Sequence, residues 1–256
     1  MKCLYKYPHG PFPYACLVDE NRRRGRNRSE FELLDTGVFD DDRYFDVFVE
    51  YAKGGVEDIL IRITAINRGP DPARLHLLPS VWFRNTWSWR NGATRPSLGQ
   101  SPEGSTTLVL DEPYYGRRWL YCDADPELLF TENETNVARL YGVPNRSRHV
   151  KDAFHEFVIH GRSDAVNPDR VGTKAAARYV PEIGPGETFT CRLRFTEQAF
   201  PPAAGAFGDF DRVFAARRAE ADQFYAAVTP SSLSADGQHV MRQAFAGLLW
   251  SKQFYH

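Results

Sequence analysis

Alternation of apolar and polar residues is the feature that most limits how this chain can fold. It is clearest in Thr188–Phe195 (TFTCRLRF), where Phe, Cys, Leu and Phe take every second position and Thr or Arg the positions between them. A period of two residues is typical of a β-strand with one buried face, so Arg192 and Arg194 are predicted to point outward. The same period in Tyr44–Tyr51 and Ile59–Ile66 predicts two more strands.

Turn-forming sequences separate the predicted strands. Asn67–Pro72 (NRGPDP) and Ile183–Glu187 (IGPGE) are rich in Gly and Pro, which favour reversals of the chain. Further strands are predicted at residues 2–8, 74–83 (interrupted by Pro79), 106–110, 118–122, 127–131, 137–141 and 154–160, and loops at 9–30 and 90–104. Many short strands with turns between them are typical of a sandwich or barrel, so we expect a mainly β fold built on an antiparallel β-sandwich.

The sequence changes character after residue 206. Apolar residues recur at three- and four-residue spacing in Asp209–Val228, which predicts an amphipathic helix that Pro230 ends. A second helix is predicted to start near Ser234, whose hydroxyl can cap it, and to run on to His256 without a stop signal. The expected organisation is a β-sandwich domain at 1–206, a linker helix at 207–230 and an unfinished helix at 231–256.

Charge and cysteine content argue against several classes of function. The 32 basic and 33 acidic residues give a formal net charge of −1, so no global field would attract nucleic acid or a membrane. The basic run at 21–28 (NRRRGRNR) is interpreted as a solvated loop or an ion-pair partner of Asp40–Asp42, because no nucleic-acid-binding signature accompanies it. There is no CxxC pair, signal peptide or apolar run of about 18 residues. We expect a cytoplasmic protein without nucleic-acid or membrane partners.

The segment Val81–Trp89 (VWFRNTWSW) is the strongest candidate for a binding site. It holds three of the chain's five tryptophans, with Arg84 and Asn85 between them. Flat aromatic faces beside planar hydrogen-bonding groups suit a ligand with apolar faces and polar edges, such as a sugar. The alternative is the buried end of an aromatic strand, because aromatic side chains supply large apolar area to any core.

No catalytic or metal-binding motif is recognisable. The three adjacent aspartates in Asp40–Arg43 (DDDR) lack the alternating spacing of a calcium loop, so they are interpreted as fixing a tight turn, pairing with arginines or lining a sugar site. His155 and His160 are expected on opposite sides of a strand, in structural roles. The sequence contains no HxH, HExxH, GxSxG or phosphate-loop pattern, and no cofactor is expected.

Several long blocks resemble glycoside hydrolase family 63, the family of mannosyl-oligosaccharide glucosidase, and bacterial glucosidases of that type. The blocks are Tyr5–Pro8 (YKYP), Glu32–Lys53, Asp58–Pro70, Leu75–Trp89 and Ala244–His256. The resemblance implies an N-terminal super-β-sandwich, a helical linker and an (α/α)6 barrel that holds the active site. It also implies inversion at the anomeric carbon, with one carboxylic acid protonating the leaving oxygen and a second carboxylate activating water.

In this family both catalytic carboxylates belong to the barrel, and the chain breaks off in what resembles the barrel's first helix. No residue here therefore inherits either catalytic role, and the chain alone is expected to be inactive. Sandwich loops in this architecture close over the barrel mouth, which implies a gluco-oligosaccharide or small α-glucoside as ligand and the barrel as partner. The implied substrate-binding residues are Arg84, Asn85, Trp87, Trp89, Asp41 and Arg43.

Two other interpretations remain open from the sequence. The aromatic segment and the absent catalytic pair fit a stand-alone carbohydrate-binding or interaction module. Both ends of the chain cut through predicted elements, which fits a gene fragment without independent function.

Overall fold

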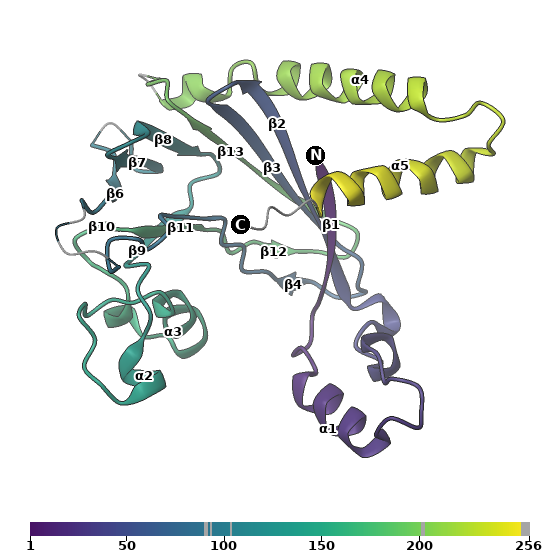
Figure 1. Ribbon diagram of the computed structural model, residues 1–256, viewed down its shortest axis with the longest axis horizontal. Helices are drawn as coiled ribbons and strands as arrows, with labels where there is room; N and C mark the ends of the chain where they lie inside the picture. Colours follow the sequence, from purple (N-terminus) through teal and green to yellow (C-terminus); the bar gives the residue numbers. More distant parts are fainter. Residues whose placement is uncertain (90–91, 93, 103, 201–202, 252–256) are drawn as a thin grey trace. The chain divides into compact units, whose positions relative to one another are not determined.

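The computed structural model describes residues 1–89, 92, 94–102, 104–200 and 203–251, and these form two compact units, Met1–Gly208 and Asp209–His256 (Figure 1). The first unit is mainly antiparallel β-sheet with a few helices. Its largest sheet has eight strands in the order β1 (Lys2–Pro8), β2 (Tyr44–Gly55), β3 (Asp58–Asn67), β13 (Thr188–Thr196), β8 (Gly116–Cys122), β7 (Thr107–Glu112), β6 (Ser97–Gln100) and β10 (Val171–Gly172).

Two smaller sheets complete the β-structure described in this unit. The three-stranded sheet has the order β5 (Ser80–Trp82), β11 (Lys174–Arg178) and β9 (Glu127–Thr131), and the two-stranded sheet pairs β12 (Glu182–Ile183) with β4 (Ala73–Arg74). One core cluster takes buried side chains from all three sheets, among them Phe45, Ile63, Leu193, Phe130, Ala175 and Ile183. Side chains buried in this shared cluster therefore hold the three sheets together.

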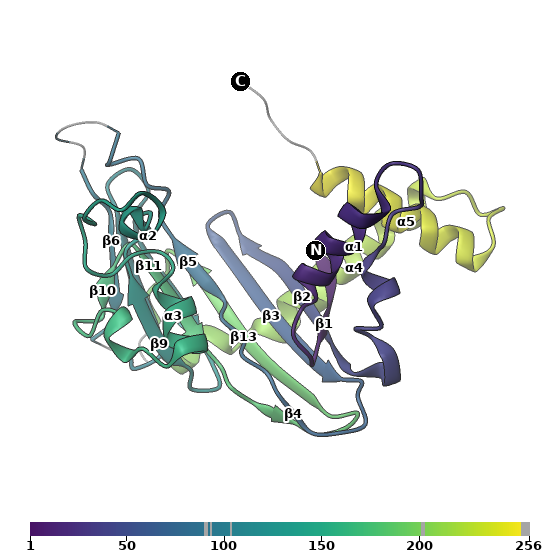
Figure 2. The same cartoon turned by 90° about the horizontal axis from the view of Figure 1, so that it is seen from below.

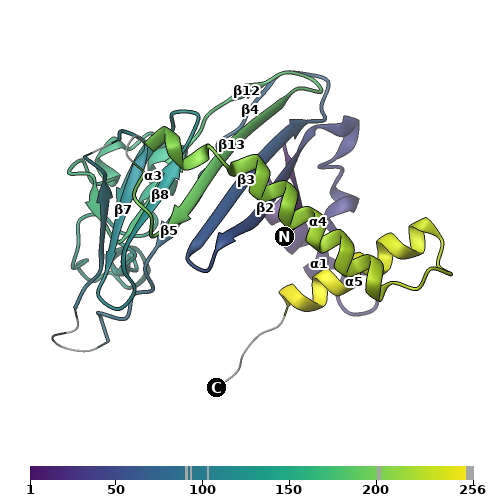
Figure 3. The ribbon, with the colours of Figure 1, turned by 90° about the horizontal axis from the view of Figure 1, so that it is seen from above.

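The alternating segments form strands as predicted. β2, β3 and β13 run side by side in register, with Val49 opposite Ile63 and Ile63 opposite Cys191 (Figure 3). The inward residues expected in Thr188–Phe195 all belong to or pack against the core cluster. When one face of a strand is buried, its apolar and polar residues must alternate, so the local sequence is enough to predict it.

Arg194 lies on the opposite face of β13 from the core residues Cys191 and Leu193, as predicted, but that face is not open to solvent at this point. Its side chain is only 6% exposed, because the Asp58 carboxylate accepts two hydrogen bonds from the guanidinium, from Nε at 2.8 Å and from Nη2 at 2.6 Å. Arg194 Nη1 also donates to the Ala206 carbonyl (2.8 Å), and the Phe200 ring centroid lies 4.8 Å from Cζ. The outer face of β13 is therefore covered here, and a buried ion pair replaces the expected solvated arginine.

Three segments are helical where no helix was predicted. The loop expected at 9–30 contains α1 (Tyr14–Arg24), and the strands expected at 137–141 and 154–160 are α2 (Val137–Tyr141) and α3 (Ala153–His160). In Figure 2, α3 lies beside β9. Caps and local ion pairs explain these helices, since a period-two reading of short apolar segments cannot detect either.

The contacts that stabilise α1 and α2 join residues that are close to one another in the sequence. In α1, Glu20 pairs with Arg23 and Arg24, and the three arginines of the last turn suit the negative end of the helix dipole. Arg22, Arg23 and Arg24 of the basic run are thus paired within their own helix, and no ion pair between the run and Asp40–Asp42 occurs among the described residues. Asn136 caps α2 by accepting from the Arg139 N–H (3.1 Å).

His155 and His160 do not face opposite sides as expected. They lie on one helix with their ring centroids 5.6 Å apart. The strand expected at 74–83 is interrupted at Pro79 as predicted, because proline has no N–H to donate to a ladder, and β5 begins directly after it. The part before Pro79 is shorter than expected, since β4 ends at Arg74.

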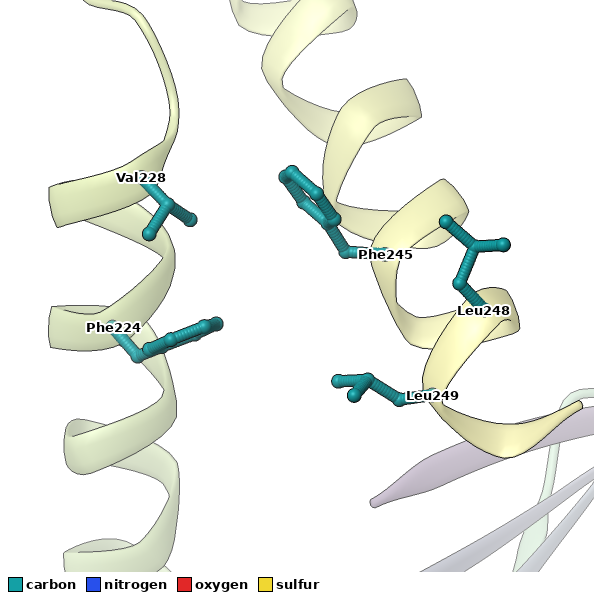
Figure 4. Close-up of a pocket in the computed structure, with 5 residues that line it drawn as sticks. All are labelled: Phe224, Val228, Phe245, Leu248 and Leu249. Carbon is teal, nitrogen blue, oxygen red and sulfur yellow. The ribbon is translucent and has the colours of Figure 1, made fainter. Parts of the chain in front are cut away.

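The second unit consists of two helices, α4 (Phe210–Val228) and α5 (Ala235–Trp250), as the apolar periodicity predicts. The Ser234 hydroxyl caps α5 by accepting from the Gly237 N–H (3.1 Å). An apolar groove of about 250 Å³ lies between the helices and is lined by Phe224, Val228, Phe245, Leu248 and Leu249 (Figure 4). The end of the predicted helix, residues 252–256, lies outside the described residues.

The pairing of β1 with β2 carries an acid-sensitive contact. Asp46 is 8% exposed and accepts from Lys6 Nζ and Arg68 Nε, both at 2.7 Å. Burial alone would raise the pKa of Asp46, but these two hydrogen bonds outweigh burial and lower it below its ordinary value. Below pH ~4 the unfolded chain therefore takes up this proton before the folded chain does, and the stability that Asp46 contributes is lost.

We expect Asp46→Asn to lower the free energy of unfolding by about 2 kcal/mol at neutral pH, because it removes the charge from two hydrogen bonds. The gap between this variant and the parent should close as the pH falls from about 4 towards 2. Urea unfolding at a series of pH values measures this, with Asp19→Asn as an exposed control. A gap that stays constant with pH contradicts the assignment.

Candidate functional site

The loop that carries Trp87 and Trp89 starts at the end of β5 and is anchored there by two hydrogen bonds. The Phe83 N–H donates to the Thr173 carbonyl (3.0 Å), and the Asn133 side-chain amide donates to the Phe83 carbonyl (2.8 Å). Thr173 precedes β11 and Asn133 follows β9, so all three strands of the smaller sheet hold the loop in place.

The tip of this loop presents an aromatic face to solvent. The Asn85 side chain accepts from the Ser88 N–H (3.2 Å), so its amide oxygen shapes the turn. Arg84 Cζ lies 5.2 Å from the centroid of the Trp89 ring, and Trp89 is 65% exposed. A cation over one face of the ring limits its motion while much of its surface stays accessible.

Trp87 lies deeper, in a cluster with an arginine and two glutamates. Its indole Nε1–H donates to Glu134 Oε1 (3.2 Å), and Arg95 Cζ lies 5.7 Å from the Trp87 ring centroid. Arg95 also forms an ion pair with Glu132 and lies 3.9 Å from Glu134 Oε1. Both glutamate side chains are under 20% exposed, whereas that of Arg95 is 44% exposed. The Arg95 side chain therefore contacts two largely buried carboxylates and is partly exposed to solvent.

The two glutamates are positioned by the end of β9. Thr131 is the last residue of the strand, so Glu132 and Glu134 follow it with one residue between them. Glu132 also accepts from the Thr173 hydroxyl (2.6 Å), which in turn accepts from the Asn133 N–H (2.8 Å). The Asn133 N–H, the Thr173 hydroxyl and the Glu132 carboxylate thus form a hydrogen-bonded chain that ends at Arg95 and orients its side chain.

The arrangement can bind a polar ligand with apolar faces. Trp89 offers an exposed ring, Trp87 a half-buried one, and Arg95 unused guanidinium surface at 44% exposure. Glu132 and Glu134 already have arginine, hydroxyl or indole partners. Both carboxylates therefore hold neighbouring side chains in place, Glu132 those of Arg95 and Thr173 and Glu134 that of Trp87.

The predicted binding residues fall into two groups. Arg84, Asn85, Trp87 and Trp89 share one loop, as the sequence requires. Asp41 and Arg43 lie at the start of β2 instead: Asp41 is exposed with φ of 56°, and Arg43 Nη1 pairs with Asp71 Oδ2 at 2.7 Å. In the part of the chain that the structure describes, no hydrogen bond or ion pair links these two residues to the Trp87 cluster.

Sequence reasoning missed Arg95, Glu132 and Glu134. Arg95 belongs to a segment predicted to be loop, and the glutamates to a polar run (TENETN) after an apolar strand. Two carboxylates spaced by two residues directly after a buried strand are a usable signal, because such side chains leave the strand end on the same side. Their meeting with Trp87 depends on the pairing of β9, β11 and β5.

Metal-binding and membrane-spanning features were also sought across the described ranges. There, no three His, Cys, Asp or Glu side chains gather so that they could hold a metal ion. None of the helices in those ranges combines the length and apolar character that crossing a bilayer takes.

Comparison with known proteins gives one relative and no family assignment. No protein-family model matches the chain. The chain is similar to "Uncharacterized protein YMR196W" of Saccharomyces cerevisiae, with 37% identity over 298 aligned residues. The match covers 100% of this chain and 27% of the yeast protein, so the chain spans about a quarter of that relative's length.

Proposed function

We propose that this chain is the non-catalytic β-portion of an inverting α-glucosidase-like glycoside hydrolase related to family 63, and that it binds glucosyl residues. The observation that carries the proposal is the pair of tryptophans: Trp89 is exposed beside Arg84, and Trp87 is fixed by Glu134 beneath Arg95. Aromatic rings stack on the apolar faces of a sugar, while arginine donates to its hydroxyl groups. The resemblance of the sequence blocks supplies the enzyme class.

In this proposal, the β-portion is a super-β-sandwich, and hydrolysis takes place in an (α/α)6 barrel that lies outside the chain. An acid in the barrel protonates the leaving oxygen and a base activates water, while the tryptophan loop holds the sugar from the rim. The glutamates beneath Arg95 orient that arginine. The chain alone is therefore expected to bind an α-glucoside or gluco-oligosaccharide without cleaving it.

The helical unit supports this placement. Phe224, Leu248 and Leu249, which line the groove between α4 and α5, are each more than half exposed (Figure 4). Apolar side chains in such a patch are typical of surfaces that another element covers. In our proposal the covering element is the remainder of the (α/α)6 barrel, and α5 is its first helix.

The four free cysteines fit the cytoplasm as the compartment.

Calorimetric titration of the 256-residue chain with methyl α-glucoside and with maltose tests the binding claim. We expect saturable binding in the millimolar range, about −4 kcal/mol, because a rim alone contacts one side of the sugar. Sorbitol has similar hydroxyl groups but no ring face, and it should give no saturable heat. Equal responses to sorbitol and the glucosides, or no response to either, contradict the proposal.

A stand-alone carbohydrate-binding module would use the same residues. The proposed enzyme and a binding module are distinguished by whether the full-length protein hydrolyses an α-glucoside. An enzyme of the proposed class releases β-glucose from an α-glucoside, which proton NMR detects directly, whereas a binding module releases no glucose.

A further inference from the structure

A polar groove lies where β6, β7 and β8 meet at one end of the large sheet. Its volume is about 250 Å³, and its lining includes Arg95, Ser97, Asp111 and Arg117. Ser97 is the ladder partner of Asp111, and Asp111 is the partner of Arg117, so the three strands bring these residues into one row about 10 Å across. Directly opposed residues on neighbouring strands share a face of the sheet.

The β7–β8 hairpin presents two exposed aromatic rings between residues that line this groove. Tyr114 is 85% exposed and Tyr115 is 65% exposed, with their ring centroids 4.9 Å apart and the rings perpendicular. Pro113 and Gly116, the residues on either side of them, both line the groove. Two neighbouring aromatic rings on one turn offer flat apolar surface on which the face of a ligand can stack.

Hydrogen bonds from two backbone N–H groups to the Glu112 side chain hold this turn. Glu112 Oε2 accepts from the N–H groups of both Tyr114 (2.7 Å) and Tyr115 (2.6 Å). Gly116 closes the three-residue loop with φ of 72°, a conformation that glycine adopts without strain. The hairpin therefore keeps its shape without help from the tyrosine rings, which remain available for a ligand.

Arg95 is part of both the polar groove and the Trp87 cluster. It lines the polar groove, and it also pairs with Glu132 and lies over the Trp87 ring. The tryptophan loop and the tyrosine hairpin are thus joined through one half-exposed guanidinium, with aromatic surface on each side of it.

We propose that the groove and the Tyr114–Tyr115 hairpin form a second sugar subsite, so that the ligand is a gluco-oligosaccharide extended across Arg95 rather than a single glucosyl unit. This inference rests on the proposed function and adds the substrate length to it. The first subsite stacks one glucosyl ring on the tryptophan loop. The second receives the following units, with Asp111 and Arg117 on their hydroxyl groups and a tyrosine on a ring face.

The test is a calorimetric titration of the 256-residue chain with glucose, maltose and maltopentaose. We expect maltopentaose to bind about tenfold more tightly than glucose, because a second stacked ring adds up to about that factor. Tyr114→Ala/Tyr115→Ala should remove this preference and leave the glucose affinity unchanged. Tyr141→Ala, a change to a tyrosine 71% exposed on α2, should alter neither. Circular dichroism confirms that the variants are folded.

The outcomes separate the two proposals. If glucose and maltopentaose bind equally tightly, or if the double tyrosine variant still prefers maltopentaose, the proposal of a second subsite is overturned. Sugar binding at the tryptophan loop is unaffected by either result. If the parent chain binds none of the three sugars, both proposals are overturned. A length preference that Tyr141→Ala also removes contradicts the assignment to the hairpin.

Discussion

Asp58→Ala is expected to lower the free energy of unfolding by about 3–5 kcal/mol, because it removes one partner of a buried, bidentate ion pair with Arg194. The Arg194 side chain is 6% exposed and that of Asp58 is 16% exposed, so water can replace little of the lost interaction. Asp58 Oδ1 and Oδ2 each lie within 2.8 Å of a guanidinium nitrogen, so the variant removes a bidentate, charge-assisted contact. Urea unfolding followed by circular dichroism measures the loss.

Two matched variants make the result specific. Asp71→Ala breaks an exposed pair with Arg43, whose side chains are 62% and 47% exposed, and should cost less than about 1 kcal/mol. Asp58→Leu combined with Arg194→Met removes both charges and should recover most of the stability that Asp58→Ala loses. If Asp58→Ala costs no more than Asp71→Ala, the buried pair does not stabilise the fold as argued.

Trp89→Ala is expected to weaken glucoside binding about 30-fold, which corresponds to about 2 kcal/mol for the loss of a central aromatic contact. Its unfolding free energy should change by no more than about 0.5 kcal/mol, because the side chain is 65% exposed. Trp250→Ala is the control, since that ring is 58% exposed on α5. Calorimetry and urea unfolding of each variant separate affinity from stability.

Trp87→Phe distinguishes the role of the deeper ring. It keeps an aromatic ring beside Arg95, although a smaller one, and removes the indole N–H that donates to Glu134. We expect a smaller loss of affinity, about fivefold, from one hydrogen bond of roughly 1 kcal/mol. If Trp89→Ala binds sugar as tightly as the parent chain, the tryptophan loop is not the binding surface.

The sequence predicts those parts of the fold that local periodicity determines. β2, β3 and β13 each bury one face, so alternation alone identifies them and their inward residues. Arg194 escaped prediction because its partner, Asp58, is 136 residues away in the chain. A side-chain cap at Asn136 starts α2, and α3 packs against β9; an alternating reading of their apolar residues detects neither.

The candidate site divides in the same way. Its aromatic half is one continuous segment, so Arg84, Trp87 and Trp89 could be proposed from composition. Arg95 and the two glutamates come from separate segments that meet only after β5, β9 and β11 have paired. Asp41 and Arg43 were grouped with the tryptophans through the resemblance, and in the structure Arg43 pairs with Asp71 at the start of β2.

The most direct test of the central claim is the NMR spectrum of the tryptophan indole N–H groups during a titration with maltose. The chain has five tryptophans, and the Trp87 N–H is hydrogen-bonded to Glu134, so its signal is a sensitive report on the cluster. We predict saturable shifts of the Trp87 and Trp89 signals, with the Trp250 signal unchanged. If the Trp87 and Trp89 signals stay fixed at saturating maltose, or all five signals move together, this surface is not a sugar site.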